Sequence, residues 1–276
     1  MFSRSSNKKF RSAIRYGGYN EIHIGKIDDQ RKLLGKNILI TGGSSGIGFQ
    51  IAKKCCACGA SVIITGRNED KLVQASKAIQ GDIRYYVWDI SDINDIRKNV
   101  TEINNIFQGE LNCLVNNAGL QPHEFFPEVT EKEWENIYNT NSKGLFFLTQ
   151  EVSKIWMGNR KDEYRKIINI DSQGGFVGAT YPYRMVKWDI RGLTQGLGLR
   201  LAREGILVNA IAPGVVKTEM QEFALKQGNN TYCDQNPLHR VSLPEEVAEL
   251  AAFMLSDACS FMVGQTIVID GGYSIK

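Results

Sequence analysis

The chain alternates between short, mostly apolar runs and longer segments with helical spacing. Seven runs of four to six residues carry this pattern: residues 38–41, 61–65, 83–88, 111–115, 167–170, 207–211 and 266–269. Strands without polar alternation are typical of parallel sheets that helices cover on both faces. The pattern therefore predicts an α/β fold built on a doubly wound parallel sheet.

The segment before the first run differs in character from the rest of the 276-residue chain. We expect an N-terminal extension over residues 1–33 and one domain over residues 34–276, because single α/β domains of this size are common. Within the extension, the spacing of Ile22, Ile24 and Ile27 favours a short strand or a docked segment.

Composition and charge exclude several kinds of partner. Apolar residues make up 42% of the chain, and no apolar run approaches the ~20 residues of a membrane span. The net charge of +3 is too small to indicate nucleic-acid binding. We therefore expect neither a membrane nor a nucleic acid as partner.

Positive charge is concentrated in the extension, since residues 1–35 contain eight lysines and arginines and three acids. The first sixteen residues are basic, contain several serines and lack acids, as in a solvated tail or a mitochondrial transit peptide. We expect a tail on a cytoplasmic protein, with mitochondrial import as the alternative. The absence of an apolar stretch here argues against secretion.

Three of the six cysteines, Cys55, Cys56 and Cys58, crowd onto the helix predicted after residue 45. Their spacing contains C-x-x-C, but no second ligand pair follows at the distance of a zinc site. We expect these thiols to pack in the core and to bind no metal. Unpaired thiols also indicate a reducing compartment.

A glycine-rich turn, Thr41 to Gly48 (TGGSSGIG), joins the first strand to the next predicted helix. Glycines at such a turn let the backbone approach a pyrophosphate closely, and the amides and dipole of the helix stabilise its charge. The turn alone is weak evidence, because similar runs also form ordinary tight turns.

The end of the second strand bears on which dinucleotide binds. An acid here bonds the adenosine ribose, whereas its absence beside an arginine makes room for a 2′-phosphate. Gly66 stands where the acid would be and Arg67 follows it, so we expect NADP, with NAD as the alternative. Asp89 ends the third strand, where it either reaches the adenine amino group or caps the next helix.

These features and several further motifs occur in the order found in the short-chain dehydrogenase/reductase family. The matching motifs are T-G-x-x-x-G-x-G at 41–48, Asn116-Asn117-Ala118-Gly119, Asn141, Ser172, Tyr183-x-x-x-Lys187 and Pro213-Gly214. The resemblance covers about Gly35 to Tyr273. It implies a Rossmann fold and an NAD(P)-dependent oxidoreductase that interconverts a secondary alcohol and a ketone.

The resemblance also implies which residues meet the cofactor. They are Gly42, Ser44, Ser45, Gly46, Ile47, Gly48, Arg67, Asp89, Ile90, Asn117, Ala118, Gly119, Tyr183, Lys187, Pro213, Gly214, Val216 and Thr218.

Four polar residues are candidates for catalysis. Carbonyl reduction leaves charge on oxygen, so the site needs a proton donor, and Tyr183 fits this role. Lys187 lies one helical turn beyond, where its charge is expected to favour the tyrosinate. Ser172 follows a strand at the edge where ligands bind and can donate to the substrate oxygen. Asn141 matches the family asparagine that supports a water leading protons to the lysine.

The substrate is not determined by these motifs. Ser172 and Tyr183 are 11 residues apart, about two fewer than is common in the family, so we expect a shortened substrate loop. A polar rim (Gln121, His123, Gln173, Gln221) favours a sugar or polyol, and the resemblance favours a 3-oxoacyl thioester. We interpret His123 as a surface residue.

The resemblance adds two expectations about the C-terminal part. Residues 219–240 correspond to a lid, and residues 263–272 to a last strand that is commonly buried between subunits, so we expect a homotetramer or a homodimer. Two alternatives to a dehydrogenase remain. One is a nucleotide-binding regulator without catalysis, and the other is a sugar-nucleotide epimerase, for which the segment after Tyr183 is short.

Overall fold

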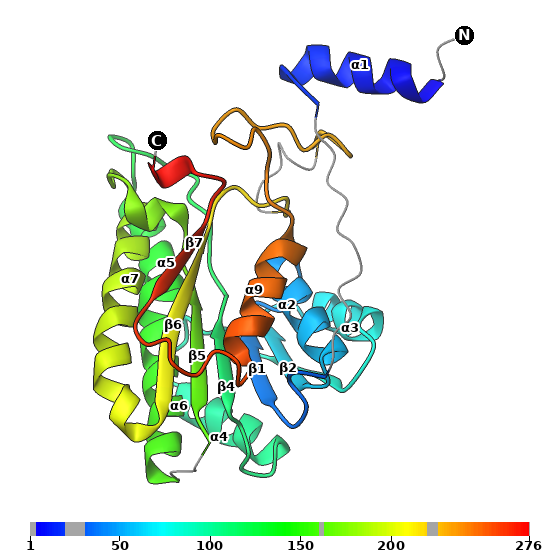
Figure 1. The fold of residues 1–276 in the computed structure, drawn as a ribbon. Coiled ribbons are helices and arrows are strands. Elements are labelled where there is room, and N and C mark those ends of the chain that lie inside the picture. Colours follow the sequence, from blue (N-terminus) through cyan, green and yellow to red (C-terminus); the bar gives the residue numbers. More distant parts are fainter. Residues whose placement is uncertain (1–3, 20–30, 160–162, 220–225, 276) are drawn as a thin grey trace.

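A seven-stranded parallel sheet forms the centre of the molecule (Figure 1). The computed structural model describes residues 4–19, 31–159, 163–219 and 226–275. The strands lie in the order β3-β2-β1-β4-β5-β6-β7. They are β1 (Asn37–Thr41), β2 (Ser61–Gly66), β3 (Ile83–Val87), β4 (Cys113–Asn116), β5 (Arg165–Ile170), β6 (Ile206–Pro213) and β7 (Thr266–Ile269). All seven predicted strands are confirmed, with shifts at several ends.

Helices cover both faces of this sheet, as the doubly wound fold requires (Figure 1). Those of the main domain are α2 (Gly46–Ala57), α3 (Glu69–Ala78), α4 (Ile96–Ile106), α5 (Glu131–Tyr138), α6 (Leu145–Gly158), α7 (Pro182–Leu201) and α9 (Pro244–Leu255). Four short turns of helix complete the fold: η1 (Asn139–Gly144), η2 (Gln173–Phe176), η3 (Ala202–Glu204) and η4 (Tyr273–Ile275).

The core consists of two large apolar layers, one on each face of the sheet. Ile38 and Ile40 of β1 join the layer under α2, α3 and α9, whereas Leu39 between them joins the layer under α4 and α6. Because successive residues face opposite layers, both faces of the central strands are mostly apolar. The edge strand β3 differs, because Tyr85 and Val87 are 38% and 44% exposed.

All six cysteines are buried, and Cys55, Cys56 and Cys58 pack in the layer under α2, α3 and α9, as expected. No group of histidine, cysteine or acidic side chains in the described part of the chain could hold a metal ion. Among the described helices, none is long and apolar enough to span a membrane.

The N-terminal arm contains a helix that the sequence did not predict, α1 (Arg4–Tyr16), which lies outside the layers of the domain (Figure 1). Beyond it, the Asn230 side chain donates a 3.1 Å hydrogen bond to the carbonyl of Gly18. The Tyr232 ring lies so close to Gly18 that no Cβ would fit there. The predicted strand at Ile22–Ile27 lies outside the described residues.

Candidate active site

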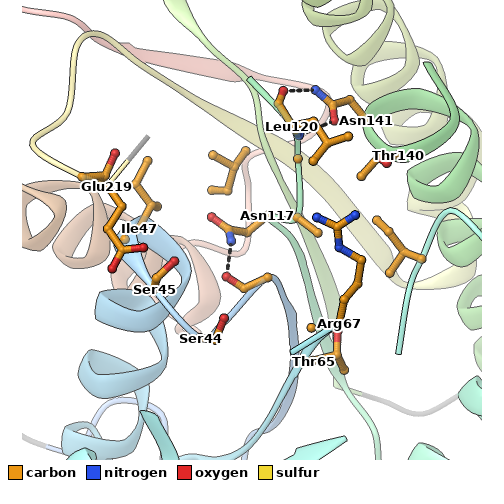
Figure 2. A pocket seen from close by; sticks show the side chains of 18 of the residues that line it. Ser44, Ser45, Ile47, Thr65, Arg67, Asn117, Leu120, Thr140, Asn141 and Glu219 are labelled. Carbon is orange, nitrogen blue, oxygen red and sulfur yellow. Dashed lines mark hydrogen bonds between the residues drawn. The ribbon is translucent and has the colours of Figure 1, made fainter. Parts of the chain in front are cut away.

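The carboxyl ends of the central strands open into one cavity of about 500 Å³ (Figure 2). It lies where the strand order changes direction, with β2 on one side of β1 and β4 on the other. Open parallel sheets bind ligands at this switch point, because the loops on either side diverge and leave a crevice.

All but one of the residues predicted for catalysis or cofactor binding line this cavity. The exception is Gly48, which is buried below the glycine turn. A Cβ at Gly48 would collide with the Asn117 side chain and the Gly42 carbonyl. Gly48 therefore serves close packing of α2 against the turn, and its contact with the cofactor stays a prediction.

The glycine turn is held in shape by Asn117. Its side-chain Nδ2 donates to the carbonyls of Thr41 and Gly42, both at 2.9 Å (Figure 2). Gly42 has a φ of +65°, which favours glycine, and a Cβ there would lie 2.8 Å from Ala118 Cα. The sequence therefore needs both the glycine and the asparagine to build this turn.

The first turn of α2 fits the pyrophosphate of a dinucleotide. Ser45 is the N-cap, and its side chain makes no capping hydrogen bond. The amides of the next residues have no partner within the helix, so they face the cavity as donors. A Cβ at Gly46 would come within 3.2 Å of the Thr218 methyl group, so a side chain there would narrow the cradle.

Charged residues of both signs surround one end of the cavity, next to the carboxyl ends of β2 and β3. We call this the far end of the cavity. Arg67 Nη1 lies 3.9 Å from Asp89 Oδ2, and Lys71 Nζ lies 3.2 Å from Glu219 Oε2. Asp89 Oδ1 accepts hydrogen bonds from the backbone and side chain of Ser91. One carboxylate oxygen of Asp89 thus stabilises the turn at Ser91, and the other faces Arg67.

Two buried polar atoms at this end have no hydrogen-bond partner among the described residues, Thr65 Oγ1 and Trp88 Nε1. Both residues line the cavity. Buried polar groups are normally paired, so these two atoms are consistent with a polar ligand beside them.

Helix α7 carries the tyrosine and the lysine to the same wall of the cavity. The helix begins with Pro182 at its first position, where a missing amide costs nothing. Tyr183 and Lys187 are four residues apart and share a face, and Lys187 Nζ lies 5.4 Å from the centroid of the Tyr183 ring. Ser172 caps η2 at the end of β5, where its Oγ accepts a 3.0 Å bond from the Gly174 amide.

The pKa of Tyr183 is set mainly by burial. Burial and the nearby Asp171 carboxylate together raise it to about 12, and the Ser172 side chain acts in the opposite direction. Burial also lowers the pKa of Lys187, and Asp171 opposes that change. Burial thus has the largest effect on the tyrosine, and the expected favouring of the tyrosinate by Lys187 stays a prediction.

Asn141 lies in a π-helical turn, η1, between α5 and α6. Its Oδ1 accepts a 2.7 Å bond from the Leu120 amide, and its Nδ2 donates a 2.9 Å bond to the Leu120 carbonyl (Figure 2). The side chain is thus committed to the loop after β4. A water that leads to Lys187 would need the Asn141 backbone, and this role stays a prediction.

Several residues of the cavity wall were missed by the sequence analysis, among them Asp171, Lys71, Thr140, Leu120 and Glu219. For Asp171 the sequence held a signal, an acid between a buried strand and Ser172. Lys71 and Glu219 are far apart in sequence, so only the fold brings them together.

The cavity wall does not include Gln121, His123 or Gln173 of the predicted polar rim. His123 is exposed and its amide donates to Glu133 Oε1 at 2.7 Å, which agrees with a surface role. Gln221 lies outside the described residues. An aromatic pair stands nearby instead, since Phe125 and Tyr181 meet edge-to-face with centroids 4.9 Å apart.

The fold and the cavity define a Rossmann-type oxidoreductase with a dinucleotide-binding turn. A family model described as enoyl-(acyl carrier protein) reductase matches residues 42–274. The chain belongs to the short-chain dehydrogenase/reductase family.

Individual relatives support this assignment over nearly their whole length. The chain is 34% identical to the 3-oxoacyl-[acyl-carrier-protein] reductase of Aquifex aeolicus over 251 residues, which covers 87% of this chain and 98% of that protein. It is 31% identical to the gluconate 5-dehydrogenase of Gluconobacter oxydans, with 90% and 98% covered. The Pseudomonas aeruginosa RhlG/NADP active-site complex has a TM-score of 0.83 at 28% identity, with 90% and 100% covered.

Proposed function

We propose that this oxidoreductase transfers hydride between NADP(H) and a ketone or secondary alcohol, with Tyr183 as the proton donor and acceptor. The observation that carries the proposal is that Ser172, Tyr183 and Lys187 line the same cavity as the glycine turn. When bound, the nicotinamide supplies or accepts the hydride.

The protein's own residues then handle the proton and the orientation. Tyr183 donates its hydroxyl proton to the substrate oxygen in reduction and takes it back in oxidation. Ser172 holds the substrate oxygen next to that hydroxyl. Lys187 binds the nicotinamide ribose and supplies positive charge near the developing anion. Asn141 fixes the Leu120 loop at the edge of the site.

NADP is preferred in this proposal because two cations, Arg67 and Lys71, line the far end of the cavity. A 2′-phosphate would replace Asp89 as the partner of Arg67, whose side chain is 62% exposed and free to turn. NAD is the alternative, since Asp89 and Glu219 put two acids in the same place.

For the substrate we favour a 3-oxoacyl thioester over a sugar or polyol. Phe125 and Phe126 are 51% and 76% exposed, and Phe125 contacts Tyr181 two residues before Tyr183. An apolar rim fits an acyl chain better than a ring of hydroxyls. The likeness to the Aquifex reductase supports the 3-oxoacyl thioester. Because of the likeness to the gluconate dehydrogenase, a sugar or polyol is also tested.

The test is a substrate panel followed at the absorbance of the reduced nicotinamide. Acetoacetyl-CoA, longer 3-oxoacyl thioesters and 5-ketogluconate are each assayed with NADPH and with NADH. We expect the highest kcat/KM with a thioester and NADPH. Turnover of 5-ketogluconate alone would contradict the acyl substrate, and equal rates with both nucleotides would contradict the cofactor preference.

A homotetramer, or failing that a homodimer, completes the proposal, with residues 1–33 as an extension of the domain. Large apolar side chains are exposed on the outer helices, with Trp188 and Leu199 of α7 at 45% and 81% and Phe146 of α6 at 40%. Such residues favour an interface between subunits. Light scattering on the purified protein measures the assembly directly.

A further inference from the structure

A buried carboxyl group, that of Asp171, lies in the wall of this active site. Asp171 lies between the end of β5 and Ser172 and is 3% exposed. Neither of its carboxyl oxygens has a hydrogen-bond partner among the described residues. An unpaired buried carboxylate is costly, so its presence beside catalytic groups calls for a physical explanation.

The position of this carboxyl group is set by the packing of η2 against α7. A Cβ on Gly175 would lie 3.1 Å from Asp171 Oδ2 and 2.9 Å from the Lys187 carbonyl. The oxygen therefore occupies a narrow gap between the two elements, behind Ser172. Only a glycine at position 175 leaves this gap open.

The groups that act on this carboxyl group come mainly from α7. Lys187 and Arg191 are the two cations that lower its pKa, together with the Ser172 amide, but burial outweighs them and raises its pKa to about 7. In return, Asp171 raises the pKa of both Lys187 and Tyr183. Arg191 is partly engaged elsewhere, since its guanidinium lies 4.3 Å from the centroid of the Phe176 ring.

We propose that Asp171 is a positioning residue that sets the pH range of proton transfer by Tyr183, because its charge offsets that of Lys187 at the tyrosine hydroxyl. The inference rests on the proposed role of Tyr183. An ionised Asp171 keeps Tyr183 a neutral acid, which is the form needed for ketone reduction. A neutral residue at 171 would favour the tyrosinate, which is the base needed for alcohol oxidation.

The first test is the pH dependence of alcohol oxidation in the nearly isosteric Asp171→Asn variant. Loss of the negative charge should move the rising limb of kcat/KM toward lower pH by about one unit. Asp189→Asn is the matched control, because Asp189 is an exposed acid on α7, the helix that carries Tyr183 and Lys187. That variant should keep the wild-type profile. A lower rate without a shift in Asp171→Asn would show a merely structural role and overturn the proposal.

The second test needs neither cofactor nor turnover. Carbon-13 NMR of the aspartate carboxyl groups follows the Asp171 signal, which is assigned by its absence from Asp171→Asn or, if that variant does not fold, from Asp171→Ser. We expect a midpoint near 7 in the wild type. Lys187→Met should raise this midpoint, because a cation that stabilises the carboxylate is lost. An unchanged midpoint would overturn the coupling.

The two tests separate this inference from the proposed function. If Tyr183→Phe is inactive but the Asp171→Asn profile does not move, the role of Asp171 fails and that of Tyr183 stands. If Tyr183→Phe turns over normally, the catalytic assignment itself fails, whatever the NMR titration shows.

Discussion

The Lys187 ammonium donates a 2.8 Å hydrogen bond to the carbonyl oxygen of Ile170. This bond ties α7 to the last residue of β5 and places a nearly buried cation, 7% exposed, at the end of the sheet. The cation thus sits below the Tyr183 ring and is not bound to its hydroxyl in this arrangement. Tyr183 and Lys187 are therefore both placed to contact a ligand in the cavity, while burial keeps the tyrosine protonated.

Replacing Tyr183 by phenylalanine tests the proton donor. We expect kcat to fall by at least ~10²–10⁴-fold, because a positioned acid is lost, while the Kd of the cofactor stays nearly unchanged. Steady-state kinetics and a fluorescence titration of the nucleotide measure the two quantities. Tyr164→Phe is the control, since it removes an exposed hydroxyl next to the amino end of β5 and should keep full activity. Normal turnover in Tyr183→Phe would exclude this residue as the acid.

Replacing Arg67 by alanine tests the choice of nucleotide. NADPH binding should weaken by roughly 1.5–3 kcal/mol, the scale of a hydrogen bond to a charged group, and NADH binding should hardly change. Calorimetric titration with each nucleotide gives both values. Arg84→Ala, which removes an exposed arginine near the amino end of β3, should leave both affinities as they are. Equal losses for the two nucleotides would show that Arg67 does not contact the 2′-phosphate.

The Asp171 carboxyl group should also make stability depend on pH. Its pKa is 3.8 in the unfolded reference and about 7 in the folded protein, so folding favours the protonated form. Its favourable contribution is complete below pH 4 and is lost as the pH rises through 7. In urea unfolding, the free energy of unfolding of Asp171→Asn should therefore rise relative to that of the wild type between pH 4 and pH 7, by on the order of 4 kcal/mol in total. A difference that is constant across this range would contradict the prediction.

Truncation of the N-terminal arm tests where the folded domain begins. Contacts between the arm and residues 226–232 involve Tyr16 and Gly18. Deletion of Met1 to Arg15 should therefore leave turnover intact and change Tm by less than about 2 °C. Deletion through Gly18 should cost more, because Tyr232 loses its neighbour and Asn230 a hydrogen bond. A collapse of Tm with the shorter deletion would show that α1 itself is part of the fold.

Much of the fold followed from local patterns, with limits that have physical causes. The apolar runs located all seven strands, because a strand that helices cover on both faces is mostly apolar along its length. The exposure of β3 could not be predicted from the sequence. Whether a strand lies at the edge or in the centre of a sheet depends on which strands pair. Helix α1 was also missed, because the sequence over Arg4–Tyr16 contains few apolar residues.

The sequence by itself determined the turn at Thr41 to Gly48 and the Tyr183–Lys187 pair, because each depends on residues close together in the chain. Tertiary structure decided what these groups experience. The close contact of Gly48 with Asn117 joins two segments that are far apart in the sequence. The raised pKa of Tyr183 is likewise a result of packing. The burial of Tyr183 and its interaction with the Asp171 charge depend on how β5, η2 and α7 pack. A local sequence pattern does not show how much water this packing removes, so it cannot predict the pKa of Tyr183.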